Sequence, residues 1–286
     1  MQGRIIKGNG KTYTVNSEGK LYDLSLKGIL KKNKTFIAVG DYVEFSPTDL
    51  TIEKVINRTS LLKRPRIANI DQLLILDSLV EPDFELDLVL KYLTYANMND
   101  IKASIVVTKI DKGDFKEKIA QITNIFSKIG IKTYFVNNKS KEGIDKLVSD
   151  LKYQTIALVG QSGVGKSTLL NAIDVSYSRD EGEYSVNRGR GKHKTTEIVL
   201  LPFNEGYIAD TPGFSDIELD ITKEDLAKFY PGCYQKHNHC FYSNCLHISE
   251  KKCCIKNAVE VGELPKEIYN EYVRFLNTLS NTNRRY

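Results

Sequence analysis

The chain has 286 residues, of which 41% are hydrophobic and 27% are charged, and its formal net charge is +5. This composition excludes a disordered chain, and no apolar run approaches the ~20 residues that a membrane-spanning helix needs. The length allows two or three domains, each with a core of its own. Residues Met1 to Lys7 lack the apolar core of a signal peptide, so we expect a cytoplasmic protein with no membrane partner.

The positive charge is concentrated at the N-terminal end. Residues 1–68 carry 13 Lys and Arg against 6 Asp and Glu, a net charge of +7. Residues 69–216 carry −3, and residues 217–286 carry +1. A solvated surface is the simplest explanation of a charge bias, but an excess of this density favours a polyanionic partner such as RNA.

Residues 1–68 are predicted to be all-β. The pattern predicts five short strands separated by turn residues, at Arg4–Lys7, Thr12–Val15, Phe36–Val39, Tyr42–Phe45 and Ile52–Ile56. Five strands without a long helix favour a small barrel of the OB type, which binds single-stranded nucleic acid in a basic groove. A basic linker follows, with Arg58, Lys63, Arg64 and Arg66.

From Ile70 the pattern alternates between strands and helices. We expect apolar strands at Gln72–Leu76, Lys102–Thr108, Thr133–Val136 and Thr155–Val159, and helices at Phe84–Asn97, Phe115–Ile129 and Ile144–Leu151. Two further strands are predicted at Glu197–Phe203 and Gly206–Ala209. This alternation is typical of an α/β domain with a parallel sheet.

A phosphate-binding loop follows the strand Thr155–Val159. Residues 160–167 read GQSGVGKS, a complete G-x-x-x-x-G-K-S motif between an apolar strand and a helix. Its glycines let backbone N–H groups surround a phosphate at the helix N-terminus. The motif predicts that Lys166 binds the β- and γ-phosphates, which makes it a catalytic candidate, and that Ser167 binds Mg²⁺. The predicted nucleotide contacts are Gly160, Gln161, Ser162, Gly163, Val164, Gly165, Lys166, Ser167 and Thr168.

Two further motifs indicate that the nucleotide is GTP. Thr108, Lys109 and Asp111 belong to a T-K-I-D sequence at a strand end. There the Asp111 carboxylate accepts N1–H and the amino group of guanine, which adenine cannot offer, while the Lys109 stem packs on the base. In the D-T-P-G sequence at 210–213, Asp210 is expected to bind Mg²⁺ through water and Gly213 to bind the γ-phosphate.

The order of these motifs is unusual. Ordinary GTPases place the phosphate loop first and the base-reading motif last, whereas here the base-reading motif precedes the phosphate loop by about 50 residues. We therefore predict a circularly permuted GTPase domain.

Residues 188–196, R-G-R-G-K-H-K-T-T, are interpreted as switch I because they lie in a polar stretch with no helical or strand period. Thr195 or Thr196 would complete the Mg²⁺ coordination; the sequence does not decide between them, and we prefer Thr196, which is also a catalytic candidate. Phe214 stands where small GTPases keep a water-orienting Gln, so we expect slow intrinsic hydrolysis. His193 is the nearest group able to orient the water, and a solvated loop histidine is the alternative.

A Cys/His cluster marks the C-terminal segment. Three thiolates and an imidazole, from Cys240, Cys245, His247 and Cys253, are spaced C-x₄-C-x-H-x₅-C. This set suits one closed, structural Zn²⁺ site per chain, against the alternative of buried free cysteines. We expect Cys233 and Cys254 to be structural thiols, and His237 and His239 to be surface residues or alternative ligands. Helices are predicted at Lys223–Phe229, Ile255–Val261 and Pro265–Leu279, and a metal would compensate for their small apolar content.

These motifs together resemble the bacterial family of ribosome small-subunit-dependent GTPase A. The resemblance spans almost the whole chain and rests on Asn69-Ile70-Asp71-Gln72, the motif order, the G-R-G-K-H-x-T-T switch and the cysteine spacing. One departure is Lys194, which stands where the family usually has Thr.

The resemblance implies a factor for late maturation of the small (30S) ribosomal subunit and its 16S rRNA. Hydrolysis of GTP to GDP would be stimulated by that subunit. We expect a monomer with three domains: an OB-fold RNA-binding domain at 1–68, a circularly permuted GTPase domain at 69–216, and a mainly helical zinc-binding domain at 217–286.

Two other classes are the alternatives. A P-loop ATPase or small-molecule kinase is disfavoured by the T-K-I-D motif. An RNA-binding zinc protein with an idle nucleotide site would be excluded by measurable turnover.

Overall fold

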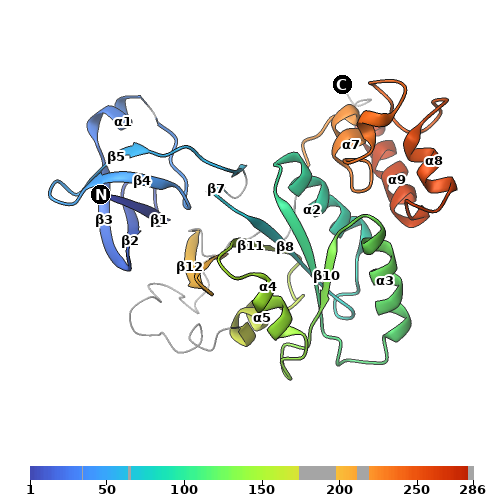
Figure 1. Cartoon of the computed structure of the whole chain (residues 1–286), viewed down its shortest axis with the longest axis horizontal. Helices are drawn as coiled ribbons and strands as arrows, with labels where there is room; N and C mark the ends of the chain where they lie inside the picture. Colours follow the sequence, from blue (N-terminus) through green and yellow to red (C-terminus); the bar gives the residue numbers. More distant parts are fainter. Residues whose placement is uncertain (34, 64–65, 174–197, 211–218, 283–286) are drawn as a thin grey trace. The chain divides into compact units, whose positions relative to one another are not determined.

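The computed structural model describes residues 1–33, 35–63, 66–173, 198–210 and 219–282 of the chain (Figure 1). Two compact units are present: unit 1 comprises residues 1–74, 144–159 and 166–214, and unit 2 comprises residues 75–143, 160–165 and 215–286. Among the helices of these described ranges, none has the length and apolar character needed to cross a membrane.

Unit 1 begins with a closed five-stranded barrel, which confirms the predicted fold (Figure 1). Its strands are β1 (Gln2–Gly8), β2 (Tyr13–Ser17), β3 (Lys20–Leu26), β4 (Tyr42–Ser46) and β5 (Thr51–Val55). They follow the order β1-β2-β3-β5-β4, and the barrel closes because β1 also pairs with β4. Alternating side chains fill the interior with a core that includes Ile5, Val15, Leu24, Val43, Phe45 and Ile52.

The predicted strand at Phe36–Val39 is wrong. That segment has no ladder and makes only an isolated bridge between Val39 and Ile67. A side chain replaces the strand partner, because the Ala38 N–H donates to the Asp41 carboxylate at 2.8 Å. The fifth strand of the barrel is instead β3, which was not predicted, and a short helix α1 (Gly28–Lys32) follows it.

The predicted basic linker contains a short hairpin. Strands β6 (Leu61–Lys63) and β7 (Arg66–Ala68) pair in antiparallel fashion, with Leu62 opposite Ile67. Leu62 and Ile67 are fully buried, so apolar burial stabilises this segment.

The second part of unit 1 is a sheet with two helices. β11 (Thr155–Val159) runs parallel to β13 (Gly206–Asp210), and β12 (Val199–Phe203) lies antiparallel to β13. The helices are α4 (Ile144–Asp150) and α5 (Lys166–Ile173). β12 also pairs with β1, at Val199 and Lys7, so the barrel and this sheet share hydrogen bonds.

A buried arginine joins the barrel to the sheet within unit 1. The Arg4 guanidinium donates to the Thr155 hydroxyl at 2.6 Å and to the Asn69 carbonyl at 2.9 Å. It also lies over the rings of Tyr42 and Tyr207, 5.0 and 4.9 Å from their centroids. Since one side chain contacts partners from four segments, the starts of β11 and β13 are held against the barrel.

Unit 2 contains the remaining parallel strands. β8 (Gln72–Ser78) begins in unit 1 and ends in unit 2, where the strand order is β10-β9-β8. β9 (Lys102–Thr108) and β10 (Lys132–Phe135) are parallel, and the connecting helices are α2 (Leu86–Met98) and α3 (Lys116–Lys128). The predicted helices and strands of this region therefore differ from the observed ones only at their ends.

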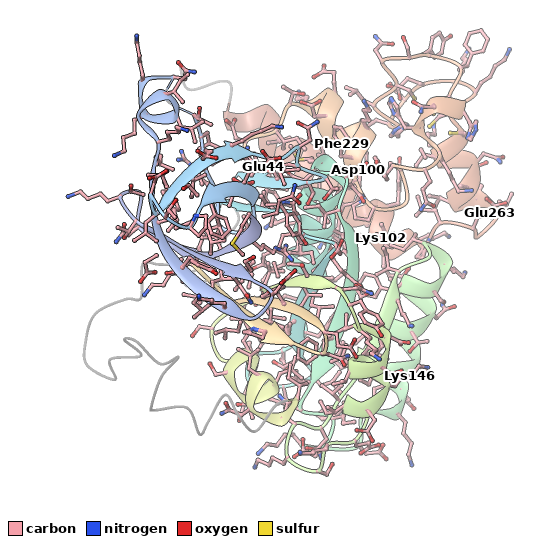
Figure 2. All side chains as sticks on the ribbon, turned by 60° about the vertical axis from the view of Figure 1, so that its left-hand side comes forward. Glu44, Asp100, Lys102, Lys146, Phe229 and Glu263 are labelled. Atoms are coloured by element: carbon pink, nitrogen blue, oxygen red, sulfur yellow. The ribbon has the colours of Figure 1, made fainter. Side chains whose placement is uncertain are left out.

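The C-terminal helices also belong to unit 2, in which α7 packs on α2. They are α7 (Lys223–Phe229), the 3₁₀ helix η1 (His237–His239), α8 (Cys254–Glu260) and α9 (Lys266–Thr282). Asn97 donates to the Phe229 carbonyl at 2.8 Å, and the Tyr234 hydroxyl donates to the Asp100 carboxylate at 3.3 Å. Figure 2 labels Phe229 and Asp100 in this region.

Candidate nucleotide site and metal centre

The base-reading motif occupies the end of β9 in unit 2. Thr108 is the last residue of the strand and is fully buried. Lys109 follows in the left-handed region, at φ 61°, which turns the chain sharply. Asp111 is exposed in the next turn, and its carboxylate has no hydrogen-bond partner among the residues that the structure describes. A carboxylate in that position is free to accept two donors from a base.

Two side chains tie the base-reading end to the phosphate loop. The Thr108 hydroxyl donates to the Val164 carbonyl at 2.6 Å. Asn138, in the loop after β10, donates from its amide to the Gly165 carbonyl at 3.4 Å. Asn137 shapes that loop, because its side-chain oxygen accepts from the N–H groups of Lys139 and Ser140. The predicted base motif and phosphate loop are thus brought together.

The glycines of the loop are required by close approach as well as by backbone conformation. Gly160 has φ 144°, and a Cβ there would lie 2.2 Å from the Leu76 carbonyl oxygen of β8. Gly165 has φ 96°, and its Cβ would lie 3.3 Å from the Asn138 amide nitrogen. A side chain at Gly160 would clash with backbone that cannot move aside.

A loop that the sequence patterns did not indicate packs against both motifs. Residues 79–85 connect β8 to α2. The Lys109 ammonium donates to the Glu81 carbonyl, and the Pro82 ring lies against Gly163. Gln161 donates from its amide to the Glu85 carboxylate at 2.8 Å. The residues Glu81-Pro82-Asp83 favour a turn at the start of the predicted helix, but they do not indicate which residues that turn contacts.

A buried carboxyl group supports this loop. Asp77 accepts hydrogen bonds from the Ser78 and Glu85 N–H groups, at 2.7 and 3.0 Å. Burial raises the pKa of Asp77 to about 7, because the two backbone hydrogen bonds, which favour the charged form, compensate only in part for the lost hydration. The sequence patterns did not single out this residue.

The remaining phosphate-loop residues open α5 in unit 1. Lys166 is partly buried, and this burial lowers the pKa of its ammonium group. Ser167 and Thr168 are exposed in the first turn of the helix, so their hydroxyls are accessible.

The register of unit 1 supports the predicted Mg²⁺ side. Ala157 of β11 pairs with Ala209 of β13 in a parallel ladder. The carboxyl ends of these strands therefore lie side by side, so that Asp210 ends its strand beside the one that leads to Gly160. His193, Thr195, Thr196 and Gly213 lie outside the described residues, as does Phe214.

The predicted zinc ligands converge in the C-terminal part of unit 2. The ligand atoms of Cys240, Cys245, His247 and Cys253 all lie within 4.8 Å of one another. The Nδ1 atom of His247 is 3.6 Å from the Cys240 sulfur and 3.4 Å from the Cys253 sulfur. Of the adjacent cysteines 253 and 254, only Cys253 belongs to this four-atom set.

Neighbouring groups orient the cluster. The Nε2 atom of His247 lies 3.1 Å from the Ala227 carbonyl at the end of α7, an arrangement that leaves Nδ1 for the metal. His237, expected to be a surface residue or an alternative ligand, contacts the same Nε2 atom through its Nδ1, at 3.3 Å. The Tyr269 and Tyr272 hydroxyls donate to the carbonyls of His247 and Leu246.

The chemistry of the donor set fits Zn²⁺. Three sulfurs and one imidazole nitrogen are the usual ligands of a closed tetrahedral site. Burial raises the pKa of the Cys245 thiol to about 12, so a thiolate there needs a nearby cation. A bound Zn²⁺ would supply that charge and displace the thiol proton.

Comparisons with known proteins cover the whole chain. The model of the RsgA GTPase family matches residues 55–220, and the RsgA N-terminal domain model matches residues 2–52. The chain is 38% identical, over all of both chains, to the small ribosomal subunit biogenesis GTPase RsgA 2 of Listeria monocytogenes. It is 37% identical to the RsgA of a Geobacillus species, over 100% of this chain and 99% of the relative.

Two solved structures are also similar to the chain over nearly its whole length. YloQ, described as a circularly permuted GTPase, matches with a TM-score of 0.81 at 32% identity, over 100% of this chain and 96% of that one. YjeQ from Thermotoga maritima matches with a TM-score of 0.82 at 31% identity, over 97% and 98% of the two chains.

Proposed function

Because the chain belongs to the RsgA GTPase family and is a GTP-hydrolysing enzyme, we propose that it acts in the maturation of the small ribosomal subunit, which stimulates its turnover. The relatives at 37 to 38% identity over full length carry that role in their names. The observation that carries the proposal is the link between the guanine motif and the phosphate loop through Thr108 and Val164. Membership of a GTPase family argues against the ATPase or kinase alternative.

Guanine selection is assigned to the end of β9. The exposed Asp111 carboxylate accepts N1–H and the exocyclic amino group of guanine, while the Lys109 stem covers the base. The Lys109 ammonium is already held by the Glu81 carbonyl, so the stem loses little freedom when the base binds. Residues 160–168 surround the phosphates with backbone N–H groups, and Lys166 neutralises their charge.

Mg²⁺ is assigned to Ser167 and Asp210, with Thr195 or Thr196 supplied by switch I and Gly213 contacting the γ-phosphate. Bound Mg²⁺ neutralises charge on the phosphate oxygens. His193 is the proposed acceptor of a hydrogen bond from the attacking water, because Phe214 has no polar group for that task. Subunit binding would order His193 and so stimulate hydrolysis.

Zn²⁺ is proposed as a structural ion, one per chain, held by Cys240, Cys245, His247 and Cys253. Since all four positions of a tetrahedral ion are taken by side chains, the site has no catalytic role. Together with the barrel, this site supports a division into domains at 1–68, 69–216 and 217–286.

The proposed partner of the barrel is the 16S rRNA. Besides the net charge of +7 on residues 1–68, the guanidinium groups of Arg58 and Arg66 lie over the Phe36 ring, 5.0 and 5.1 Å from its centroid. The ring is 38% exposed, and a partly exposed aromatic ring beside two cations suits a site that binds nucleic acid. We infer a monomer that acts in the cytoplasm, where ribosomal subunits are assembled.

The test is a nucleotide-competition and turnover assay. GTP hydrolysis is measured with and without purified small subunits, in the presence of excess ATP. We expect turnover that ATP does not inhibit and that subunits stimulate. Asp111→Asn is the matched control, because its amide suits xanthosine triphosphate and should shift the preference to that nucleotide. Turnover that large subunits stimulate equally would contradict the assignment of the partner.

A further inference from the structure

A fifth thiol lies against the metal cluster. The sulfur of Cys254 is 3.1 Å from the sulfur of Cys240, and the Cys254 thiol is 3.0 Å from the Lys236 carbonyl, to which it donates. Cys240 and Cys254 are both partly exposed, whereas Cys245 and Cys253 are buried. The contact therefore joins the most accessible metal ligand to a cysteine outside the ligand set.

We propose that Cys240 and Cys254 form an oxidation site at which a peroxide joins the two sulfurs in a disulfide and thereby releases the metal. The inference rests on the proposed zinc site, because the release step requires Cys240 to be a ligand. The sulfurs must approach each other by about 1 Å to reach a disulfide bond length. Both cysteines border η1 or α8, so a side-chain rotation can supply that movement.

The reaction balances with hydrogen peroxide as the oxidant. The Cys240 thiolate attacks one peroxide oxygen, the O–O bond breaks, and a sulfenic acid and hydroxide form. The Cys254 sulfur then attacks the Cys240 sulfur, the S–O bond breaks, and the Cys254 proton leaves with the oxygen as water. Thiolate, thiol, peroxide and one proton give a disulfide and two waters.

Geometry makes this pair the preferred product. A resolving thiol already in contact with the oxidised sulfur needs no diffusion, so its attack outcompetes further oxidation of the sulfenic acid. Cys233 is fully buried, which keeps peroxide in solution away from it. Once Cys240 is lost, Cys245, His247 and Cys253 remain as an incomplete set, which holds the ion less tightly.

The test uses the full chain loaded with zinc, whose metal content is measured first. Hydrogen peroxide is added, zinc release is followed with a chromophoric chelator, and disulfides are mapped by mass spectrometry of non-reduced peptides. We expect a Cys240–Cys254 disulfide to form at the rate of zinc release, and dithiothreitol with added zinc to reverse both changes. Mapping in the unsubstituted protein does not depend on a variant that folds.

Cys254→Ser separates this role from a purely structural one. The serine variant should bind zinc normally, form no disulfide at Cys240 and accumulate sulfinic acid there, so that dithiothreitol with added zinc no longer restores the site. Cys233→Ala, which removes another thiol of the same domain, should form the disulfide and recover its zinc as the unsubstituted protein does. Full recovery of zinc binding by oxidised Cys254→Ser after dithiothreitol treatment, or a disulfide in the unsubstituted protein that joins other cysteines, would overturn the proposal. A chain that contains no zinc but still forms the Cys240–Cys254 disulfide would instead contradict the zinc assignment.

Discussion

We predict that the hydrogen bond from the Thr108 hydroxyl to the Val164 carbonyl holds the phosphate loop in place. Thr108→Val keeps the shape of the side chain and removes only its hydroxyl. Both residues are fully buried, so water cannot replace the donor at the Val164 carbonyl. A buried acceptor left unpaired costs about 1–3 kcal/mol, more than the net gain of an ordinary hydrogen bond.

That cost has two measurable effects. The free energy of unfolding in urea should fall by about 1–3 kcal/mol. In addition, the Val164 carbonyl is free to turn, and the loop must be ordered again when nucleotide binds. The dissociation constant for a fluorescent GDP analogue should therefore rise by about fivefold to 150-fold, the equivalent of the same free energy.

Thr108→Ser is the matched control, because it keeps the hydroxyl and loses one methyl group. It should bind GDP within about threefold of the unsubstituted protein, since only a small cavity is created. If Thr108→Val and Thr108→Ser bind GDP equally well, the hydroxyl does not position the loop.

Four further predictions concern the other sites. His193→Ala should bind GTP and the small subunit normally, but its subunit-stimulated rate of GTP hydrolysis should fall by about tenfold to a thousandfold. An unchanged stimulated rate would show that His193 has no catalytic role. Metal analysis should find about one zinc ion per chain in the unsubstituted protein and less in Cys245→Ser, which should also unfold at a lower urea concentration. Cys245→Ser should still bind GDP, because the zinc ligands and the base-reading residues lie on different elements. Asp77 has a pKa of about 7 in the folded protein against an ordinary 3.8, so the folded state holds a proton that the unfolded chain releases. Its contribution to stability is therefore complete below pH 3.8 and lost as the pH rises through about 7, by up to about 1.4 kcal/mol per pH unit, and Asp77→Asn should remove this slope in urea unfolding. Replacing the exposed Lys31 and Lys32 by Glu should weaken subunit binding and flatten its salt dependence, and an unchanged slope would place the RNA contacts elsewhere.

Substitution of Lys31 and Lys32 is a better test of RNA contacts than deletion of residues 1–68, because that segment also supports the rest of unit 1. Removing residues 1–68 would also remove Arg4, whose guanidinium binds Thr155 and Asn69 inside unit 1. It would further expose the edge of β12 that pairs with β1. A protein without residues 1–68 would therefore lose the contacts that hold the start of β11, the strand that leads into the phosphate loop, together with the proposed RNA surface.

Chemistry that depends on residues close together in the chain could be predicted from the sequence. The phosphate loop, the base-reading motif and the zinc spacing each place their groups within a few positions of one another, where chain geometry leaves little choice. The alternation of apolar and polar residues also predicted most strands and helices, because burial on one face imposes a period. It failed at Phe36–Val39, where the Asp41 side chain replaces a strand partner.

Contacts between distant groups depend on how complete elements pack. The loop at residues 79–85 reaches Lys109 and Gln161, Arg4 reaches Thr155, and Cys254 lies against Cys240. These contacts depend on strand register and on the packing of complete elements, and a shift of one residue in register would break them. A local pattern carries no record of such register, because it reports only which face of an element is buried and not what lies opposite.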